Sequence, residues 1–163
     1  MELRRLALTT HFKKFGFTPD ADFPAVYGVV MDWDIGDATA SVLSMRDGTA
    51  SLYTTAAFGV IGGQMHERVR RAAVRFVKTA AQFAESGKRV ATFDYPRSGQ
   101  VFYYLLTYAG VRLVVSDELA TVSGSDPANP LFAAAQKVLT ELRLVSEKNN
   151  ALNPGLVPGV PHE

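Results

Sequence analysis

Carboxylates near the end of the first apolar run are the first residues in this 163-residue sequence with the chemistry of a catalytic site. Asp32, Asp34 and Asp37 lie within the stretch "VVMDWDIGDATA". Carboxylates on neighbouring elements can hold two magnesium ions and so activate a phosphate ester. The cluster of Asp32, Asp34 and Asp37 is therefore a possible metal site. The alternative, which we favour, is a solvated acidic turn.

A second candidate site is the joint "GVIGGQMHER", where a predicted strand meets a long helix. Gly62 and Gly63 would place backbone amides at the helix start, and Arg68 would add a cation, as in many anion sites. The stretch lacks the lysine and hydroxyl of a P-loop and the spacing of a dinucleotide fingerprint. We therefore interpret the glycines as a tight turn. His66 has no second metal ligand at a suitable spacing on this helix, which favours a packed or rim residue.

The helix itself carries a basic stripe opposite its apolar face. The stripe consists of Arg68, Arg71, Arg75, Lys78 and Gln82. Such a stripe can contact phosphate backbones. Because neither glycine-rich arms nor an aromatic platform accompanies it, we interpret it as a solvated helix face and do not expect nucleic acid as a partner.

Aromatic residues crowd into the later strands, where alternation places them on both faces. They are Phe93, Tyr95, Phe102, Tyr103, Tyr104 and Tyr108. Two helices can cover only one face of a sheet. We therefore predict a homodimer that buries an interaction surface including Tyr103, Tyr104 and Leu105. The competing possibility is that the N-terminal segment folds back over this face with its phenylalanines, Phe12, Phe15 and Phe17.

Charge is distributed unevenly over the N-terminal third of the chain. Residues 1–17 carry Arg4, Arg5, Lys13 and Lys14 against Glu2, whereas residues 18–48 carry six aspartates against Arg46 alone. These two regions are expected to attract each other.

Hydropathy patterns predict the element order β-β-β-α-β-β-β-α. Asp47-Gly48 indicates a hairpin, and a two-residue turn there would place Leu43 opposite Leu52. Ala109-Gly110 indicates a second hairpin, with Leu106 opposite Leu113, although residues 100–110 could instead form a short helix. The last helix begins near Asp126 or Asn129.

The predicted fold is therefore a single α+β domain over residues 25–148. Its sheet is mainly antiparallel, and its helices pack mainly on one face. A basic leader covers residues 1–24, and a flexible Pro/Gly tail covers residues 149–163.

Composition excludes several classes of function. Lys and Arg number 17 against 16 Asp and Glu, so almost no overall field attracts nucleic acid or anionic membranes. The chain has no cysteine, which excludes thiolate metal sites and a cysteine nucleophile. No apolar run approaches the roughly 18 residues of a membrane helix. We expect a cytoplasmic protein with no cofactor and no membrane association, and with a possible protein partner.

Short stretches resemble phosphate-handling families. The strand that ends in Asp32 and Asp34 is similar to the nucleophile motif of haloacid dehalogenase-type phosphatases, and "DIGDATASVLSMRDG" resembles the first phosphate loop of actin-like ATPases. A hairpin follows here instead of a parallel unit, and the chain has no room for a second ATPase lobe. Ribonuclease H-like domains also open with three strands and a helix. That resemblance implies Asp32 and Asp94 as strand carboxylates and Glu67 as the helical one.

A longer resemblance runs from Tyr27 to about Arg143. The stretches "YGVVMDW", "ASLYTT", "GVIGG" and "VFYYLLTYAGVRLV" resemble a group of small uncharacterised bacterial proteins. The arrangement of elements is also similar to roadblock, longin and profilin-like domains, which implies a dimerising scaffold or regulator. We predict a non-enzymatic binding or assembly module, with a ribonuclease H-like phosphodiesterase as the alternative.

Overall fold

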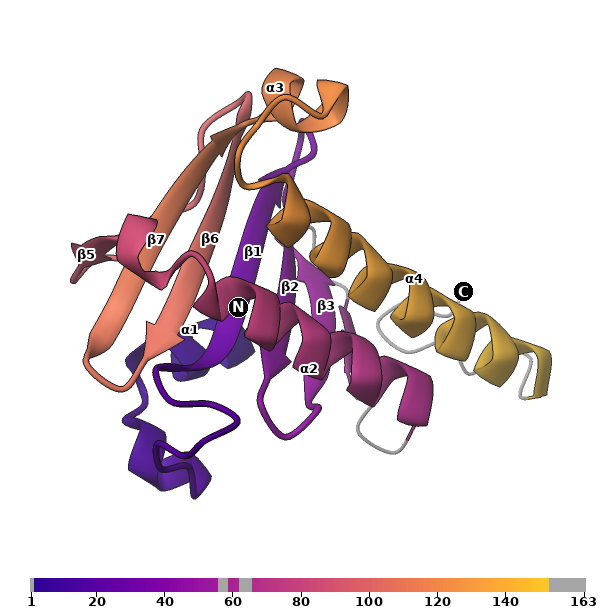
Figure 1. Cartoon of the computed structure of the whole chain (residues 1–163). Coiled ribbons are helices and arrows are strands. Elements are labelled where there is room, and N and C mark those ends of the chain that lie inside the picture. The colour runs from indigo at the N-terminus through magenta and orange to yellow at the C-terminus, as the bar shows by residue number, and fades with distance from the viewer. Residues whose placement is uncertain (1, 56–58, 62–65, 153–163) are drawn as a thin grey trace.

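A computed structural model describes residues 2–55, 59–61 and 66–152 of the chain. Its strands form one seven-stranded antiparallel sheet in the order β4-β3-β2-β1-β6-β7-β5 (Figure 1). The strands are β1 Val26–Asp34, β2 Thr39–Met45, β3 Ala50–Thr54, β4 Gly59–Ile61, β5 Lys88–Val90, β6 Gln100–Thr107 and β7 Gly110–Asp117. This confirms the predicted α+β class and the antiparallel sheet, and it shows residues 100–107 as a strand.

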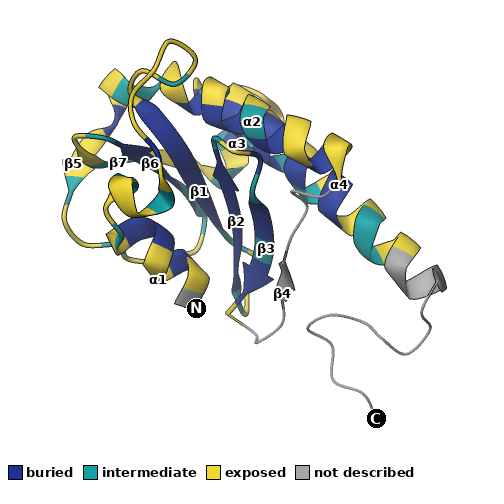
Figure 2. Ribbon diagram, turned by 90° about the horizontal axis from the view of Figure 1, so that it is seen from below, coloured by how far each residue is buried: buried dark blue, intermediate teal, exposed yellow. Residues whose placement is uncertain are grey.

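Helices lie on both faces of the sheet. They are α1 Glu2–Thr9, α2 Glu67–Ala81, α3 Glu118–Ser123 and α4 Asn129–Leu152, with 3-10 turns at η1 Phe12–Phe15 and η2 Ala84–Ser86. The buried strands lie between α1 on one side and α2 with α4 on the other (Figure 2). The predicted order of elements is present, with α1, β4 and α3 as short additions.

The main core lies between the sheet and the pair α2 and α4. The apolar stripe predicted for α2 is buried, and it comprises Val69, Ala72, Ala73, Phe76, Val77 and Ala80. From the sheet, Met31, Val42 and Leu105 join this core, and α4 contributes Val138 and Leu142. Alternation along each strand assigns these residues to one face.

The N-terminal leader builds a second core on the opposite face. Ala7, Leu8 and Phe17 of the leader are buried there against Val30 and Leu106. Burial of apolar side chains is the main force that holds such a segment in place.

The interaction surface predicted at Tyr103, Tyr104 and Leu105 therefore lies inside a single chain. Tyr103 and Leu105 belong to the α2–α4 core, and Tyr104 belongs to the leader core. None of the three is more than 1% exposed. The competing possibility, a folded-back leader, is the one that the structure shows.

Both hairpins have a register that differs from the prediction. In the first, Val42 and not Leu43 lies opposite Leu52. The Met45 N–H donates to the Thr49 carbonyl at 2.9 Å, so the loop has three residues, Arg46 to Gly48, and Gly48 has a φ of 92°. A glycine at positive φ is typical of three-residue hairpin loops. One additional loop residue shifts the pairing by one position, which is the error in the two-residue prediction.

In the second hairpin, Leu106 lies opposite Val111 instead of Leu113. Thr107 pairs with Gly110, so Tyr108 and Ala109 form the turn. Because the difference is an even number of residues, every side chain keeps its predicted face.

The ends of the predicted domain also change. Helix α4 continues to Leu152, so the first residues of the predicted tail, from residue 149, are helical. Residues 153–163 lie outside the described part of the chain. Within the described residues, no helix is both long enough and apolar enough to cross a membrane.

Candidate functional site

Asp32, the first candidate, is fully buried on the leader side of the sheet. Its carboxylate accepts hydrogen bonds from Arg4 Nη2 at 2.7 Å and from Arg4 Nε at 2.9 Å. The Ser41 hydroxyl donates to its other oxygen at 2.6 Å. Burial raises the pKa of Asp32, and the hydrogen bonds and charge of Arg4, together with Ser41, oppose that rise. The carboxylate is thus closed off by side chains of the same chain.

Arg4 is enclosed in turn. Its Nη2 also donates to the carbonyls of Phe93, at 2.8 Å, and Asp94, at 3.3 Å, and its guanidinium lies 4.1 Å from the Tyr95 ring centroid. A buried arginine with this many partners anchors α1 to β1 and to the segment before β6. The attraction predicted between the basic leader and the following aspartates is present in this Arg4–Asp32 pair, whereas the pair of Arg46 and Asp20 lies within residues 18–48.

The possible metal set is not assembled. Asp32 lies on the α1 face, whereas Glu67 opens α2 on the other face and pairs with Arg71 at 3.1 Å. Asp94 is exposed. In the part of the chain that the structure describes, no three His, Cys, Asp or Glu residues gather closely enough to hold a metal ion.

Of the other two aspartates, Asp34 ends β1 and Asp37 lies in the β1–β2 turn. Asp34 accepts a hydrogen bond from the Gly36 N–H at 3.1 Å, and Asp37 is exposed. The solvated acidic turn that we favoured for all three aspartates agrees with Asp34 and Asp37 and is wrong for Asp32, which is buried.

The glycine joint can be followed only in part, because Gly62 and Gly63 lie outside the described residues. His66 is the N-cap residue of α2, is exposed, and makes no side-chain capping hydrogen bond. Arg68 does not face the helix start. Its Nε donates to Glu141 of α4 at 3.2 Å.

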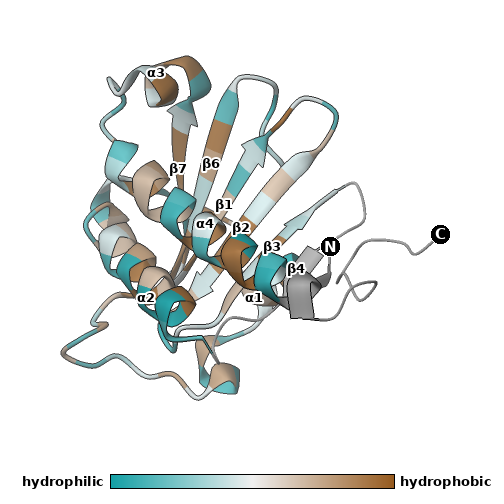
Figure 3. Cartoon of the chain, turned by 90° about the vertical axis from the view of Figure 1, so that its right-hand side faces the viewer, coloured by the Kyte–Doolittle hydropathy of each residue, from teal (hydrophilic) through white to brown (hydrophobic). Residues whose placement is uncertain are grey.

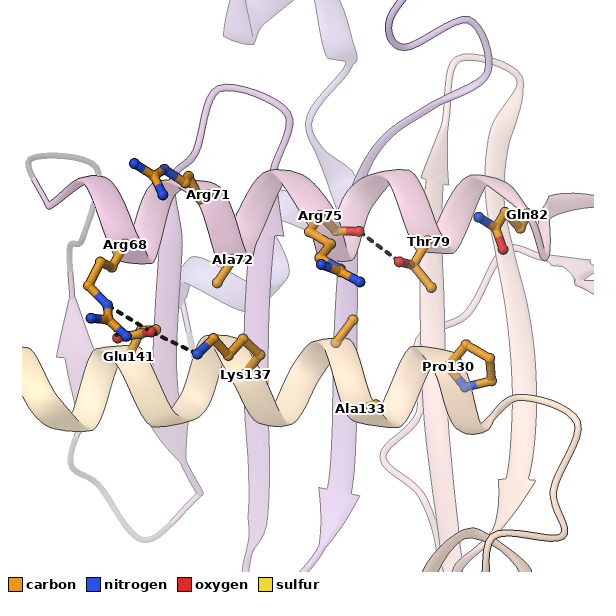
Figure 4. A pocket seen from close by; sticks show the side chains of 11 residues that line it. Arg68, Arg71, Ala72, Arg75, Thr79, Gln82, Pro130, Ala133, Lys137 and Glu141 are labelled. Carbon is orange, nitrogen blue, oxygen red and sulfur yellow. Dashed lines mark hydrogen bonds and ion pairs between the residues drawn. The ribbon is translucent and has the colours of Figure 1, made fainter.

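That contact lies in a groove between α2 and α4, which run side by side (Figure 4). The groove has a volume of about 880 Å³. Its charged lining consists of Arg68, Arg71, Arg75, Lys137 and Glu141, and its small lining residues are Ala72, Pro130, Ala133 and Ala134. Thr79 and Gln82 complete the lining toward the end of α2.

Glu141 is the single carboxylate of this lining, and it is 3% exposed. Lys137 Nζ lies 3.1 Å from one of its oxygens, and Arg68 approaches at 3.2 Å. Burial raises the pKa of Glu141, but the hydrogen bonds and charges of Lys137 and Arg68 outweigh it, so the pKa lies below its ordinary value. Glu141 therefore stays ionised and holds two cations at one end of the groove.

Arg75 is the cation in the middle of the groove. Its guanidinium points from α2 toward α4 (Figure 4). Within the described ranges, no carboxylate pairs with it. The lining has four cations and one carboxylate, and Glu67, which does not line the groove, pairs with Arg71, so the groove keeps a positive charge excess that is centred on Arg75.

A second hollow lies beside the groove, over the other side of α2. It has a volume of about 700 Å³ and shares Arg71, Arg75, Thr79 and Gln82 with the groove. Arg46, Arg70 and Lys78 add further cations, and Asp47 is its single carboxylate. We call the two hollows together the basic surface. It lies mainly on α2, where the sequence placed a basic stripe.

The arginines of the basic surface can form hydrogen bonds with an anion. Arginine presents a planar set of N–H donors that matches a carboxylate or phosphate in two parallel hydrogen bonds. The lining of the groove includes no histidine, and its carboxylate is already bound by two cations. A free general base of the kind that catalysis requires is therefore not part of this lining.

Comparisons with protein-family models, with curated proteins and with solved structures each gave no match. The function of the chain therefore has to be inferred from its own side chains.

Proposed function

We propose that the protein is a non-enzymatic binding and assembly module whose groove between α2 and α4 takes an acidic polypeptide segment. The observation that carries this proposal is the cationic groove itself, with Arg75 directed into it and without a carboxylate partner among the described residues. The cytoplasmic location expected from the sequence belongs to the same proposal. Self-association belongs to it too, since a nearly balanced net charge does not oppose association.

The spacing of the cations favours an extended ligand. Arg68 and Arg75 are seven residues apart on one helix, which corresponds to about 10 Å along its axis. One small anion cannot contact both ends of that distance. A chain with repeated negative charges can contact each cation in turn.

The rest of the lining favours a polypeptide over a nucleic acid. No aromatic side chain lines the groove, whereas proteins that bind single-stranded nucleic acid usually stack bases on aromatic rings. The small apolar residues, Ala72, Pro130, Ala133 and Ala134, can instead receive apolar side chains. A segment that carries both carboxylates and aliphatic groups satisfies the cations and the apolar lining together, as in helix-in-groove recognition.

Fluorescence anisotropy tests the proposal with two probes of equal charge, a labelled peptide rich in Glu and Leu and a labelled single-stranded oligonucleotide. We expect the peptide to bind, and Arg71→Glu with Arg75→Glu to weaken binding by about tenfold or more, which corresponds to about 1.4 kcal/mol. Arg143→Glu is the matched control, because Arg143 is exposed on α4 and does not line the groove. Tighter binding of the oligonucleotide, or equal effects of the control and the double variant, would contradict the proposal.

A further inference from the structure

A second surface lies at one end of the sheet, where the β1–β2 turn meets α3. Large apolar side chains are exposed there: Leu119 is 82% exposed, Val122 is 72% exposed and Ile35 is 48% exposed. The hydrophobic colouring of α3 is visible at this end in Figure 3. Trp33 Nε1 donates to Glu118 Oε1 at 3.4 Å, which joins the end of β1 to α3. Contiguous exposed apolar groups of this size mark interaction surfaces.

The same end is acidic. Its carboxylates are Asp34, Asp37, Asp117, Glu118 and Asp126, and neither residues 31–45 nor residues 113–136 include a lysine or arginine. Arg97 is the cation beside them, in the turn whose Gly99 carbonyl accepts from the Glu118 N–H at 2.9 Å, so carboxylates remain in clear excess. Asp117 caps α3 through the Ala120 N–H at 3.1 Å, and Asp126 accepts from the Ala128 N–H at 2.7 Å. Asp37 is exposed beside Ile35. We call this surface, with Leu119 and Val122, the acidic end.

We propose that the occupant of the α2–α4 groove is the acidic end of a second copy of this chain. This inference rests on the proposed function, since it names the partner of the same groove. The two surfaces are complementary in two ways. The acidic end offers carboxylates and large aliphatic groups, and the groove offers cations and small apolar residues.

The geometry determines the kind of assembly. The groove and the acidic end are different surfaces of one chain. Each copy can therefore bind one neighbour through its groove and another neighbour through its acidic end. Such a heterologous contact forms a ring if the rotation closes and an open chain if it does not. It differs from the two-fold dimer expected from the sequence, whose predicted surface is buried within one chain, Tyr104 under the leader and Tyr103 with Leu105 under α2 and α4.

Sedimentation velocity over a concentration series tests this inference by charge reversal. The wild-type chain should increase in mass with concentration. Asp34→Lys, Asp37→Lys and Glu118→Lys together leave Asp117 and Asp126 against three lysines at the acidic end, so this variant has two basic surfaces, and Arg71→Glu with Arg75→Glu gives a copy with two acidic ones. Each variant alone should stay at the mass of one chain, 17.7 kDa. An equimolar mixture should associate again, because every contact then joins opposite charges.

A second pair of substitutions protects the test against misfolding of the turn. Leu119→Ser with Val122→Ser changes exposed residues of a short helix and should also abolish association. A wild-type chain that stays at the mass of one chain at high micromolar concentration would overturn the inference. A mixture of the two charge-reversed variants that fails to associate, although both keep the wild-type circular dichroism spectrum, would also overturn it. The acidic peptide separates the two proposals. If it still binds the groove of a chain that does not associate, only the second copy is rejected, and if it does not bind, the proposed function is rejected too.

Discussion

Replacing Arg4 by Met would leave the Asp32 carboxylate buried without its cation, and we expect a large loss of stability. Arg4 makes its shortest contact with Asp32 at 2.7 Å, and Asp32 is 0% exposed. After the substitution, only Ser41 still donates to that carboxylate. Removal of one partner of a buried ion pair costs about 3–5 kcal/mol, because the remaining charge is left in an environment of low polarity.

Urea unfolding followed by circular dichroism measures this loss. For a chain of this size, about 3–5 kcal/mol corresponds to a fall in melting temperature of about 6–20 °C. Arg143→Met is the control, and an exposed arginine of this kind should change the free energy of unfolding by no more than about 0.5 kcal/mol. Adding Asp32→Asn to Arg4→Met should restore part of the stability, because it removes the uncompensated charge. A loss below about 1 kcal/mol for Arg4→Met would refute the reasoning that this ion pair anchors α1.

Three further predictions concern other parts of the chain. Because the pKa of Glu141 is lowered in the folded chain, its ion pairs stabilise the fold fully above the ordinary pKa of 4.5, and this stabilisation is lost as pH falls through the folded-state pKa. Glu141→Gln should therefore flatten the acid side of a plot of unfolding free energy against pH. An unchanged plot would argue against the two ion pairs. Gly28→Val should cost about 1–3 kcal/mol in urea unfolding, since a Cβ there would lie 2.6 Å from Met45 Sδ and 3.2 Å from the Ser44 carbonyl, and wild-type stability would show that the strands move apart easily. Millimolar magnesium should leave the melting temperature unchanged, because Asp32 is bound by Arg4; a rise of several degrees that Asp32→Asn abolishes would restore the metal hypothesis.

The sequence predicted the fold best where periodicity is strong. The apolar spacing from Val69 to Ala80 identified the buried face of α2, and alternation identified β1, β2 and β6. Register was less predictable, since one additional loop residue before Thr49 moved every pair of the first hairpin. Such a difference depends on the backbone conformation of Gly48, which composition does not determine.

The candidate site was predictable only on its α2 side. The basic stripe from Arg68 to Lys78 is visible in the sequence, but the groove also needs Lys137 and Glu141, and the Arg68–Glu141 pair joins residues 73 positions apart. The spacing of Lys137 and Glu141, four residues on one helix, is a weak signal that gives no partner on α2. For Asp32, the excess of cations in the leader did indicate attraction. It did not indicate that Arg4 would bury this carboxylate.

The most direct test of the central claim is to locate where an acidic peptide binds. The measurement is a two-dimensional amide NMR titration of the isotope-labelled chain with a peptide rich in Glu and Leu. The largest chemical-shift changes should fall on residues 68–82, which cover most of α2 and the residue after it, and on residues 130–141 of α4. The resonances of α1 and η1 should not change. Changes confined to the leader face, or spread evenly over all exposed arginines and lysines, would contradict the assignment of the groove as the binding site.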